Sequence, residues 1–235
     1  MINNLKILTV IPARGGSKGI PLKNLSLIGT KSIVELAAIV ASKITLLDRV
    51  IVSTDNQKIA DAAVKGGASA PFMRPDYLSG DQISDLEVLT HALHEMELKD
   101  SCVYDLIIML QPTSPLRTGL QVIQTIEKLV SKDFDAVWTI SETDSKSHPL
   151  KQLIIDEETL DYYDKDGKDI IARQQLKPVY HRNGIAYAIT RNCLINKKSI
   201  MGDKTGYLIC EGNNISIDTE SDLDFARQFF TNLNK

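Results

Sequence analysis

The cationic side chains of one short loop are the first candidates for chemistry in this chain. Arg14, Lys18 and Lys23 lie in the glycine-rich stretch Ala13–Asn24, directly after the apolar run Lys6–Ile11. Glycine lets the backbone turn sharply and bring its N–H groups close to a ligand, and such amides combined with fixed cations suit phosphate oxygens. The spacing matches neither G-x-x-x-x-G-K-[ST] nor G-x-G-x-x-G. The loop therefore predicts a polyphosphate site of another kind, although any one cation alone could be a solvated loop charge.

A second candidate is the polar stretch Arg74–Asp85, which lies between a predicted strand and a predicted helix. Because a guanidinium is planar and carries several donors, Arg74 at a strand end could contact a base edge or a phosphate. Ser84 or Asp85 is expected to cap the helix that follows, and capping and turn chemistry alone would account for the other Ser and Asp residues.

A third candidate is the loop Leu110–Arg117, which follows an apolar strand. Its two prolines fix the backbone, and Gln111, Thr113 and Ser114 supply neutral hydrogen-bonding groups. This composition suits the hydroxyl groups of a sugar or a nucleotide.

The fourth candidate is Asp218, which apolar neighbours place at the end of a predicted strand and beside a helix. Magnesium in phosphoryl-transfer sites takes one or two carboxylates together with substrate phosphates. Asp218 is therefore a candidate Mg²⁺ ligand. The alternative is that its carboxylate only caps the helix.

The overall composition narrows the class of protein. A chain of 235 residues with 43% hydrophobic and 24% charged residues is long enough for one well-buried α/β domain. The net charge of −3 argues against a nucleic-acid partner. We expect no membrane span, since no apolar run reaches roughly 18 residues, and no signal peptide, since Met1–Asn4 leads directly into the first strand. Three scattered cysteines without metal spacing indicate reduced thiols and a cytoplasmic location.

Short apolar strands alternate with amphipathic helices along the first 140 residues. This order predicts a Rossmann-like α/β fold with a mostly parallel sheet covered by helices on both faces. Ligands of such sheets bind beyond the carboxyl ends of the strands. The predicted strands are Lys6–Ile11, Arg49–Ser53, Ala70–Met73, Leu106–Leu110, Ala136–Ile140, Ile185–Thr190 and Gly206–Cys210.

Helices are predicted where apolar residues recur at helical spacing, at 33–44 and 86–96, and a last helix begins near Thr219. Two further helix starts have capping-box spacing: Thr54 with Gln57, and Thr118 with Gln121.

The alternation of strands and helices breaks between Ser141 and Arg182. This stretch is polar, yet it is too rich in Leu, Ile and Tyr for a disordered linker. We expect irregular strands or a hairpin, inserted in a single domain 1–235 and packed against a second subunit. A solvated surface flap is the alternative.

Taken together, these motifs resemble the acylneuraminate cytidylyltransferases (CMP-sialic acid synthetases), including the bacterial enzymes that activate legionaminic and related nine-carbon sugar acids. The resemblance spans nearly the whole chain, and its specificity lies in the order of the motifs. The matching segments are Ala13–Asn24, Ile51–Asp55, Arg74–Pro75, Leu110–Arg117, His148–Lys151, Arg173–Gln175, Asn183–Gly184 and Ile217–Glu220.

The resemblance implies a fold of the nucleotide-diphospho-sugar transferase type and a role for each matching residue. The CTP phosphates would be held by Arg14, Gly15, Ser17, Lys23 and Asn24, and the cytidine by Arg74, Asp81, Ser84 and Asp85. The sugar acid would be bound by Gln111, Lys151, Arg173 and Tyr187. Asp218 would hold Mg²⁺, with Mn²⁺ as an alternative, and the catalytic set would be Arg14, Lys23 and Asp218. Segment 141–182 would form a homodimer and reach the sugar site of the partner.

Two departures from the family pattern leave questions open. Ser216 stands where members often carry a second aspartate, so a two-carboxylate metal site is not implied. His181 stands where an arginine is common, and either His181 or Arg182 could meet the sugar carboxylate.

The implied reaction transfers CMP from CTP to the 2-hydroxyl of a nine-carbon α-keto sugar acid and releases pyrophosphate. Positioning and charge neutralisation dominate such in-line transfers, and no residue stands out as a dedicated general base. The alternatives are a cytidylyltransferase for an eight-carbon sugar acid and a non-catalytic nucleotide-binding protein.

Overall fold

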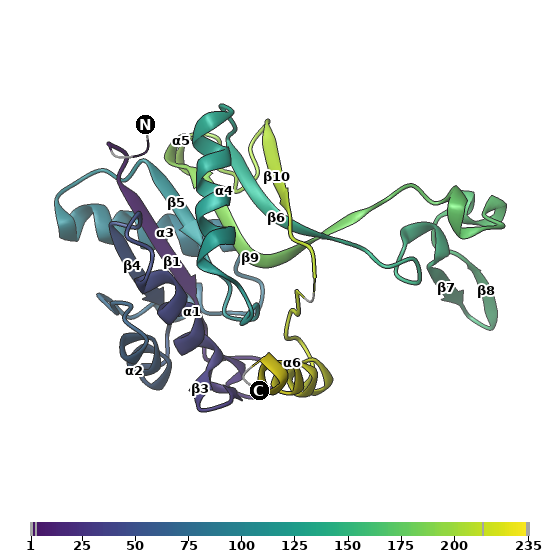
Figure 1. Cartoon of the computed structure of the whole chain (residues 1–235), viewed down its shortest axis with the longest axis horizontal. Coiled ribbons are helices and arrows are strands. Elements are labelled where there is room, and N and C mark those ends of the chain that lie inside the picture. The colour runs from purple at the N-terminus through teal and green to yellow at the C-terminus, as the bar shows by residue number, and fades with distance from the viewer. Residues whose placement is uncertain (1, 3, 213, 234–235) are drawn as a thin grey trace.

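The computed structural model describes residues 2, 4–212 and 214–233, and its centre is a six-stranded sheet (Figure 1). The strand order is β10-β6-β9-β5-β1-β4. The strands are β1 (Ile7–Pro12), β4 (Arg49–Ser53), β5 (Leu106–Met109), β6 (Ala136–Glu142), β9 (Tyr180–Thr190) and β10 (Thr205–Ile209).

The sheet is parallel except at β9, which runs antiparallel to both of its neighbours, β5 and β6. The prediction of a mostly parallel α/β sheet is therefore confirmed. The strand predicted at Ile185–Thr190 begins five residues earlier, at Tyr180. Residues 183–189 of β9 are buried, since this strand lies inside the sheet with neighbours on both sides.

Helices cover both faces of the sheet (Figure 1). One core cluster packs α1 (Ile33–Ser42), α2 (Gln57–Lys65) and α4 (Gly119–Ser131) on one face. A second packs α3 (Asp85–Asp100) and α5 (Arg191–Ile195) on the other. The last helix, α6 (Glu220–Leu233), contacts the small hairpin of β2 (Leu27–Ile28) and β3 (Lys31–Ser32).

Two local predictions are wrong. The stretch predicted as a strand at Ala70–Met73 forms no ladder, and only Ser69 beside it makes a bridge, to Ile51. Pro71 within this stretch has no N–H to donate to a neighbouring strand. Helix α2 is capped by Asn56, whose side chain accepts from the N–H groups of the first turn, rather than by Thr54. The capping box at Thr118 is confirmed.

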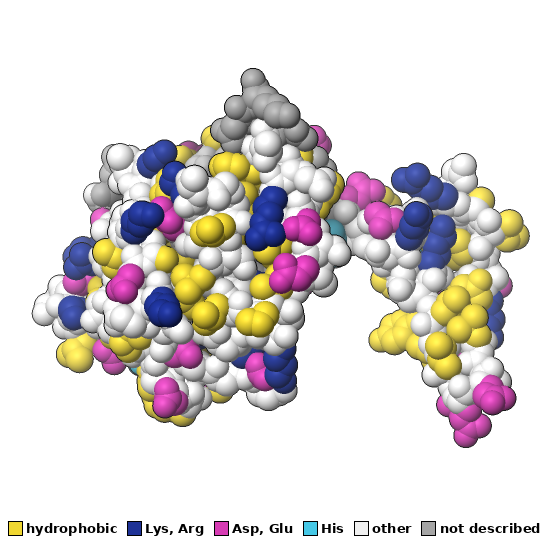
Figure 2. Space-filling view, turned by 90° about the horizontal axis from the view of Figure 1, so that it is seen from below, with side chains coloured by type: hydrophobic (Ala, Val, Ile, Leu, Met, Phe, Trp, Pro, Cys, Tyr) yellow, Lys and Arg dark blue, Asp and Glu magenta, His cyan; other side chains and the backbone are white. Residues whose placement is uncertain are grey.

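Residues 143–179 form an arm that projects away from the sheet (Figure 1). Its two legs continue β6 and β9, which still pair at Glu142 and Tyr180. The arm carries the hairpin of β7 (Leu153–Asp156) and β8 (Thr159–Tyr162), so the predicted hairpin is confirmed. Hydrophobic side chains gather on the surface of the arm (Figure 2). Among the described residues, no helix has the length and apolar character to cross a bilayer.

Candidate active site

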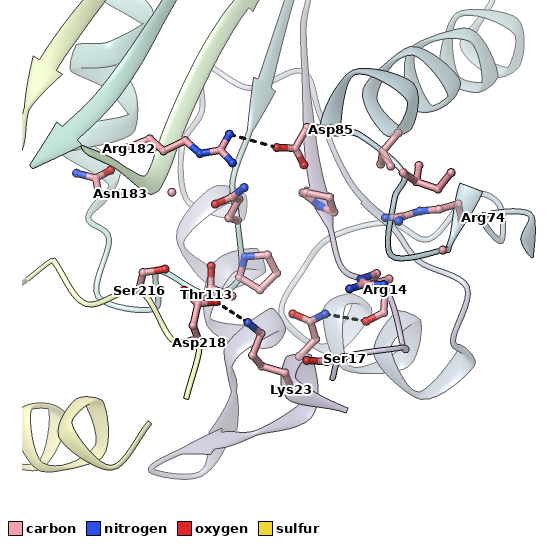
Figure 3. Close-up of a pocket in the computed structure, with 18 residues that line it drawn as sticks. Arg14, Ser17, Lys23, Arg74, Asp85, Thr113, Arg182, Asn183, Ser216 and Asp218 are labelled. Atoms are coloured by element: carbon pink, nitrogen blue, oxygen red, sulfur yellow. Dashed lines mark hydrogen bonds and ion pairs between the residues drawn. The ribbon is translucent and has the colours of Figure 1, made fainter. Parts of the chain in front are cut away.

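A cleft of about 430 Å³ opens beyond the carboxyl ends of β1, β4 and β5 (Figure 3). This is the edge where a parallel sheet binds its ligands. Strand β9 runs the other way, so its amino end reaches the same edge. The predicted site residues that line the cleft are Arg14, Ser17, Lys23, Asn24, Arg74, Asp85, Gln111 and Asp218.

The glycine-rich loop enters the cleft directly from β1. Its backbone is fixed at Gly15, whose N–H donates to the Asp55 carboxylate over 2.7 Å. Arg14 and Lys18 both pair with Asp81, at 2.5 and 2.6 Å. Hydrogen bonds from Lys18 and then Arg14 lower the pKa of the Asp81 carboxyl. The structure thus places Asp81 against the loop cations, and Asp81 is not one of the residues that line the cleft.

Lys23 joins the loop to the other side of the cleft (Figure 3). Its Nζ donates to the Asp218 carboxylate and to the Ile217 carbonyl, each over 2.9 Å. The Asn24 side chain donates to the Arg14 carbonyl, which holds the loop on itself. A Cβ on Gly19 would lie 2.8 Å from the Asp218 carbonyl oxygen, so only glycine lets the two segments approach this closely.

Asp218 lies in an irregular segment rather than at a strand end, which corrects the prediction. The segment is held by the Ile217 N–H, which donates to the Thr113 carbonyl over 2.8 Å. The helix is capped instead by Thr219, which exchanges hydrogen bonds with Asp222. The Asp218 side chain is 72% exposed, and so its carboxylate is available to a ligand.

Arg74 forms a rigid wall of the cleft. It is only 5% exposed, and its guanidinium donates to the Ser53 hydroxyl over 3.0 Å and to the Ser53 carbonyl. Its backbone N–H donates to the Thr54 carbonyl over 2.7 Å. Burial lowers the pKa of Arg74 to about 10. These contacts hold the side chain at the end of β4, whereas the sequence predicts its place after a strand at Ala70–Met73 that does not form.

Asp85 and Arg182 face each other across the cleft at 3.9 Å (Figure 3). Burial raises the pKa of the Asp85 carboxyl, and the charges of Arg182 and Arg74 oppose this shift. Ser84 accepts from the Glu87 N–H and is the N-cap of α3. It does not line the cleft, so the capping alternative accounts for this residue.

Gln111 lines the cleft beside a tight backbone corner at Gly184. The Gln111 N–H donates to the Gly184 carbonyl over 3.2 Å. Gly184 has φ +73°, and a Cβ there would lie 2.6 Å from both the Gln111 Oε1 and the Ser114 Oγ. The corner therefore requires glycine.

The structure does not place Tyr187 among the residues that line the cleft. Tyr187 is 1% exposed and belongs to the core cluster on the α3 face of the sheet. Its hydroxyl accepts a hydrogen bond from the Gly184 N–H over 2.9 Å, and burial raises its pKa. Its hydroxyl therefore supports the backbone corner at Gly184.

Lys151 and Arg173 lie on the arm, outside the cleft of their own chain. Arg173 lines a separate cavity of about 200 Å³ formed by arm residues such as Asp144 and His148. The structure therefore does not bring these two predicted sugar ligands to the site within one chain.

The cleft also includes residues that the sequence left open or did not assign. Of the two alternatives His181 and Arg182, Arg182 lines the cleft, whereas His181 hydrogen-bonds Thr143 and is not among the lining residues. Asn183 and Ser216 are further lining residues. The Asn183–Gly184 motif indicates a functional segment. Its position at the cleft depends on the direction of β9, which no local sequence pattern predicts.

The residues around Asp218 fit a magnesium ion that completes its coordination with substrate oxygens. The described residues hold no group of three or more His, Cys, Asp or Glu that could cage a metal. Asp218 offers one exposed carboxylate, and Ser216 adds a hydroxyl on the same side of the cleft. Magnesium commonly takes one or two carboxylates and substrate phosphates. Asp218 and Ser216 are therefore the residues that would hold it.

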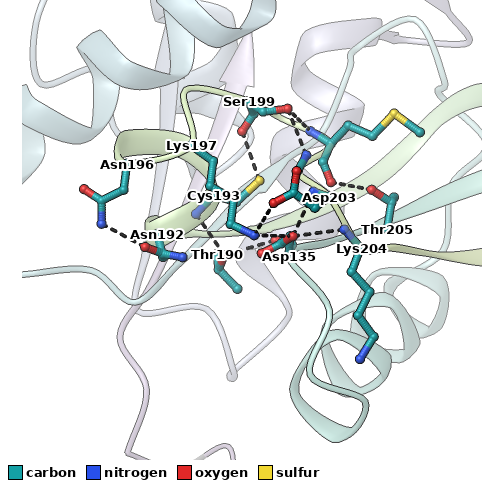
Figure 4. Close-up of polar contacts among 12 residues, drawn as sticks. Asp135, Thr190, Asn192, Cys193, Asn196, Lys197, Ser199, Asp203, Lys204 and Thr205 are labelled. Atoms are coloured by element: carbon teal, nitrogen blue, oxygen red, sulfur yellow. Dashed lines mark hydrogen bonds and ion pairs between the residues drawn. The ribbon is translucent and has the colours of Figure 1, made fainter.

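A second polar cluster lies at the opposite edge of the sheet (Figure 4). Asp135 accepts from Lys197 over 2.8 Å and from the backbone N–H groups of Asp203 and Lys204. Cys193 donates to the Ser199 carbonyl over 3.1 Å, and burial raises its pKa to about 11. These contacts are satisfied within the cluster, which ties together the chain at the ends of β6, β9 and β10.

A Rossmann-like sheet with a cationic glycine-rich loop at its carboxyl edge is an arrangement that binds nucleotide phosphates. The chain belongs to the cytidylyltransferase family, whose model matches residues 8–234. It is 30% identical to the CMP-N,N'-diacetyllegionaminic acid synthase of Legionella pneumophila over 94% of both chains. It is also 30% identical to the pseudaminic acid cytidylyltransferase of Campylobacter jejuni over 95% of both.

A solved structure shares the fold at lower identity. The chain aligns with a CMP:2-keto-3-deoxy-manno-octonic acid synthetase complexed with CTP at a TM-score of 0.71 and 18% identity. The alignment covers 97% of this chain and 99% of the other. The chain therefore shares its fold with a solved structure. The family resemblance of the sequence is confirmed by the family model and the two relatives.

Proposed function

We propose that this protein transfers CMP from CTP to the 2-hydroxyl of a nine-carbon α-keto sugar acid and releases pyrophosphate. One observation carries the proposal: Lys23 and Asp218, 195 positions apart in the chain, meet at 2.9 Å across the cleft. A cation for the phosphates and a carboxylate for a metal thus share one site. Two relatives at 30% identity are named for legionaminic and pseudaminic acids, which supports this substrate class.

The triphosphate would lie along the glycine-rich loop. Arg14, Ser17 and Lys23 would contact its oxygens, while Gly15 and Asn24 fix the loop backbone. As pyrophosphate leaves, negative charge grows on its oxygens. Arg14 and Lys23 would stabilise that charge, because preorganised donors act most strongly on charge that develops in the transition state.

The cytidine would bind between Arg74 and the start of α3. The Arg74 guanidinium is held by Ser53, so it offers a fixed planar edge to the base. Asp85 at the first turn of α3 lies on the same wall. Asp81 would take part through its ion pairs with Arg14 and Lys18 rather than by contact with the base.

The sugar acid would occupy the side of the cleft formed by Gln111 and the amino end of β9. Arg182 is the cation there, since His181 points outside. We assign the sugar carboxylate to Arg182, because a guanidinium binds a carboxylate with two parallel hydrogen bonds. The hydroxyl groups would meet Gln111 and Asn183.

Asp218 would hold Mg²⁺, or Mn²⁺ in its place, with Ser216 beside it. The metal, when bound, neutralises phosphate charge and lowers the pKa of the attacking hydroxyl. The protein supplies no evident general base at this point, so we assign none.

The arm would make the enzyme a homodimer. Leu153, Ile154, Ile155, Leu160 and Ile171 are exposed on segment 141–182, and a two-fold partner would bury them. Lys151 and Arg173 would then reach the sugar site of the partner. We further propose a single domain, 1–235, and a cytoplasmic location.

The experiment is a pyrophosphate-release assay with CTP, Mg²⁺ and a panel of nine- and eight-carbon sugar acids. We expect release with a nine-carbon acid and little with an eight-carbon acid. Release with the eight-carbon acid alone would correct the substrate class. CTP binding without release for any acid would favour a non-catalytic nucleotide-binding protein.

A further inference from the structure

The loop that carries Gln111 consists of two consecutive turns, each with proline at its second position. The Ser114 N–H donates to the Gln111 carbonyl over 3.2 Å, and the Arg117 N–H donates to the Ser114 carbonyl over 3.4 Å. Pro112 and Pro115 fix φ in the two turns. The two carbonyls that close the turns therefore both precede a proline.

Arg117 binds both of these carbonyls. Its Nε donates to the Ser114 oxygen over 3.1 Å, and its Nη2 donates to the Gln111 oxygen. A lysine could not do the same, because one ammonium lacks the rigid planar fork that reaches two acceptors at once.

The buried charge of Arg117 is unusual for a residue with a purely structural role. The residue is 4% exposed, it pairs with no carboxylate among the salt bridges of the described residues, and its Nη1 has no hydrogen-bond partner there. Burial lowers its pKa to about 9. A buried cation without a carboxylate partner is costly, and such costs are typical of functional sites.

The loop held by Arg117 is the point where three segments of the cleft meet. The Thr113 carbonyl accepts from Ile217, next to Asp218. The Ser114 Oγ donates to the Asn183 carbonyl over 2.6 Å. Gln111 itself is bonded to Gly184. A shift of this loop would move both the phosphate side and the sugar side of the cleft.

We propose that Arg117 is a positioning residue for CMP transfer. Its hydrogen bonds to the carbonyls of both turns hold Gln111 at the sugar side of the cleft. Through Thr113, which accepts from Ile217, they also hold Asp218 at the phosphate side. This inference rests on the proposed function of the cleft. It assigns no contact between Arg117 and a substrate.

The test uses the full-length variants Arg117→Lys and Arg117→Gln. The matched control is Arg191→Lys, which breaks a two-bond arginine contact with Glu97 away from the cleft. Hydrogen exchange is measured at the Ile217 and Gln111 amides. Pyrophosphate release gives kcat and KM for CTP.

For both Arg117 variants we expect exchange at the two amides to rise at least about ten-fold, with kcat falling by about ten- to a hundred-fold, as expected for small misplacement of reacting groups. The control should lose thermal stability with kcat and both amides unchanged. Protected amides with wild-type kcat in Arg117→Lys would overturn the proposal. So would an equal loss of kcat in the control.

A further variant covers the case in which the Arg117 substitutions do not fold. Ser114→Ala removes the hydroxyl that ties the loop to Asn183 and leaves the buried charge in place. We expect kcat to fall by about five- to ten-fold with faster exchange at Gln111, and an unchanged kcat would overturn the proposal. Because exchange needs no substrate, a wild-type protein that lacks transferase activity would refute the function alone.

Discussion

The cleft and the arm differ in which side chains they bury and which they expose. Around the cleft even arginines are buried: Arg74 is 5% exposed and Arg117 is 4% exposed, and backbone carbonyls accept their hydrogen bonds. On the arm even isoleucines are exposed, Ile155 to 78% and Ile171 to 92%. The buried arginines of the first region are held by contacts within one chain, whereas the second region leaves an exposed apolar surface.

This contrast separates the two halves of the site. The side of the cleft that we propose for the phosphates and the nucleoside is assembled from residues of the body alone, such as Lys23 and Asp218. The side that we propose for the sugar has Gln111 and Arg182, but Lys151 and Arg173 lie on the arm. We therefore expect substitutions in the body to act within one chain and substitutions on the arm to act on the partner.

Asp218→Asn should give the largest effect on the body side. Removing the carboxylate charge that would hold the metal should lower kcat by at least about a thousand-fold, as for the loss of a charged group that organises a metal-assisted transfer. Pyrophosphate release at saturating Mg²⁺ measures it, and a chelator should abolish activity of the wild type.

The control for this prediction is Thr219→Ala, which removes the cap of α6 but leaves the carboxylate. It should lower stability by about 1 kcal/mol with near-normal kcat. Near-normal activity in Asp218→Asn would show that Asp218 has only a structural role.

Arg14→Ala should lower kcat/KM roughly thirty-fold, which corresponds to a loss of about 2 kcal/mol of transition-state stabilisation. The reason is that the leaving group loses one preorganised cation that would stabilise its charge. The fold should persist, since the Arg14 side chain is one-third exposed. Thermal unfolding checks the fold and steady-state kinetics check the loss. Wild-type turnover in the folded variant would refute the phosphate role of the loop.

The arm prediction is a complementation between two inactive proteins. Asp218→Asn and Arg173→Ala should each have little activity, and an equal mixture should recover about a quarter of wild-type activity, since half of the two-fold dimers would be hybrids with one intact site. Subunit exchange followed by the pyrophosphate assay measures the recovery.

Sedimentation provides the independent check on assembly. A wild-type monomer at micromolar concentration would contradict the dimer. If the protein is a dimer but the mixture recovers no activity, the proposed interface would stand and the proposed role of Arg173 in the partner's site would be refuted.

Asp81→Asn should give the smallest effect, and it should improve the use of CTP where the other substitutions impair activity. In the structure Asp81 pairs with Arg14 and Lys18, the cations that would bind the triphosphate. Removing this competing charge should lower the KM for CTP by roughly two- to three-fold, the scale of an exposed ion pair. A raised KM would indicate that Asp81 contacts the nucleotide directly.

The sequence predicts the parts of the site that follow a strand end locally. The loop after β1 lies at the cleft because parallel strands share one carboxyl edge. Arg74 also lies there, but its side chain is held by Ser53 at the end of β4 and not by the strand predicted before it. The prediction fails where placement depends on distant pairing. Tyr187 has the residue type of a sugar ligand, but β9 lies inside the sheet and turns its ring into the core.

The same reason explains Arg182 and Asp218. Arg182 reaches the cleft only because β9 runs antiparallel to its neighbours, and a local sequence pattern does not predict the direction of a strand. The residues before Asp218 alternate like a strand, but their described backbone hydrogen bond goes to the Thr113 carbonyl in a loop. The positions of Lys151 and Arg173 at a site need a second copy of the chain.

The position of β9 also bears on how the chain folds. Strand β6 pairs with β9 and β10, and β5 pairs with β1 and β9, so the two halves of the sheet are joined by a strand that follows the arm. During synthesis, a nascent chain that ends before Tyr180 therefore exposes β5 and β6 as open strand edges, which can pair with other chains. The pairing of β9 with β5 and β6 depends on contacts between residues far apart in the sequence, and such contacts are slow to form. The two halves of the sheet can therefore join only after the whole arm has been synthesised.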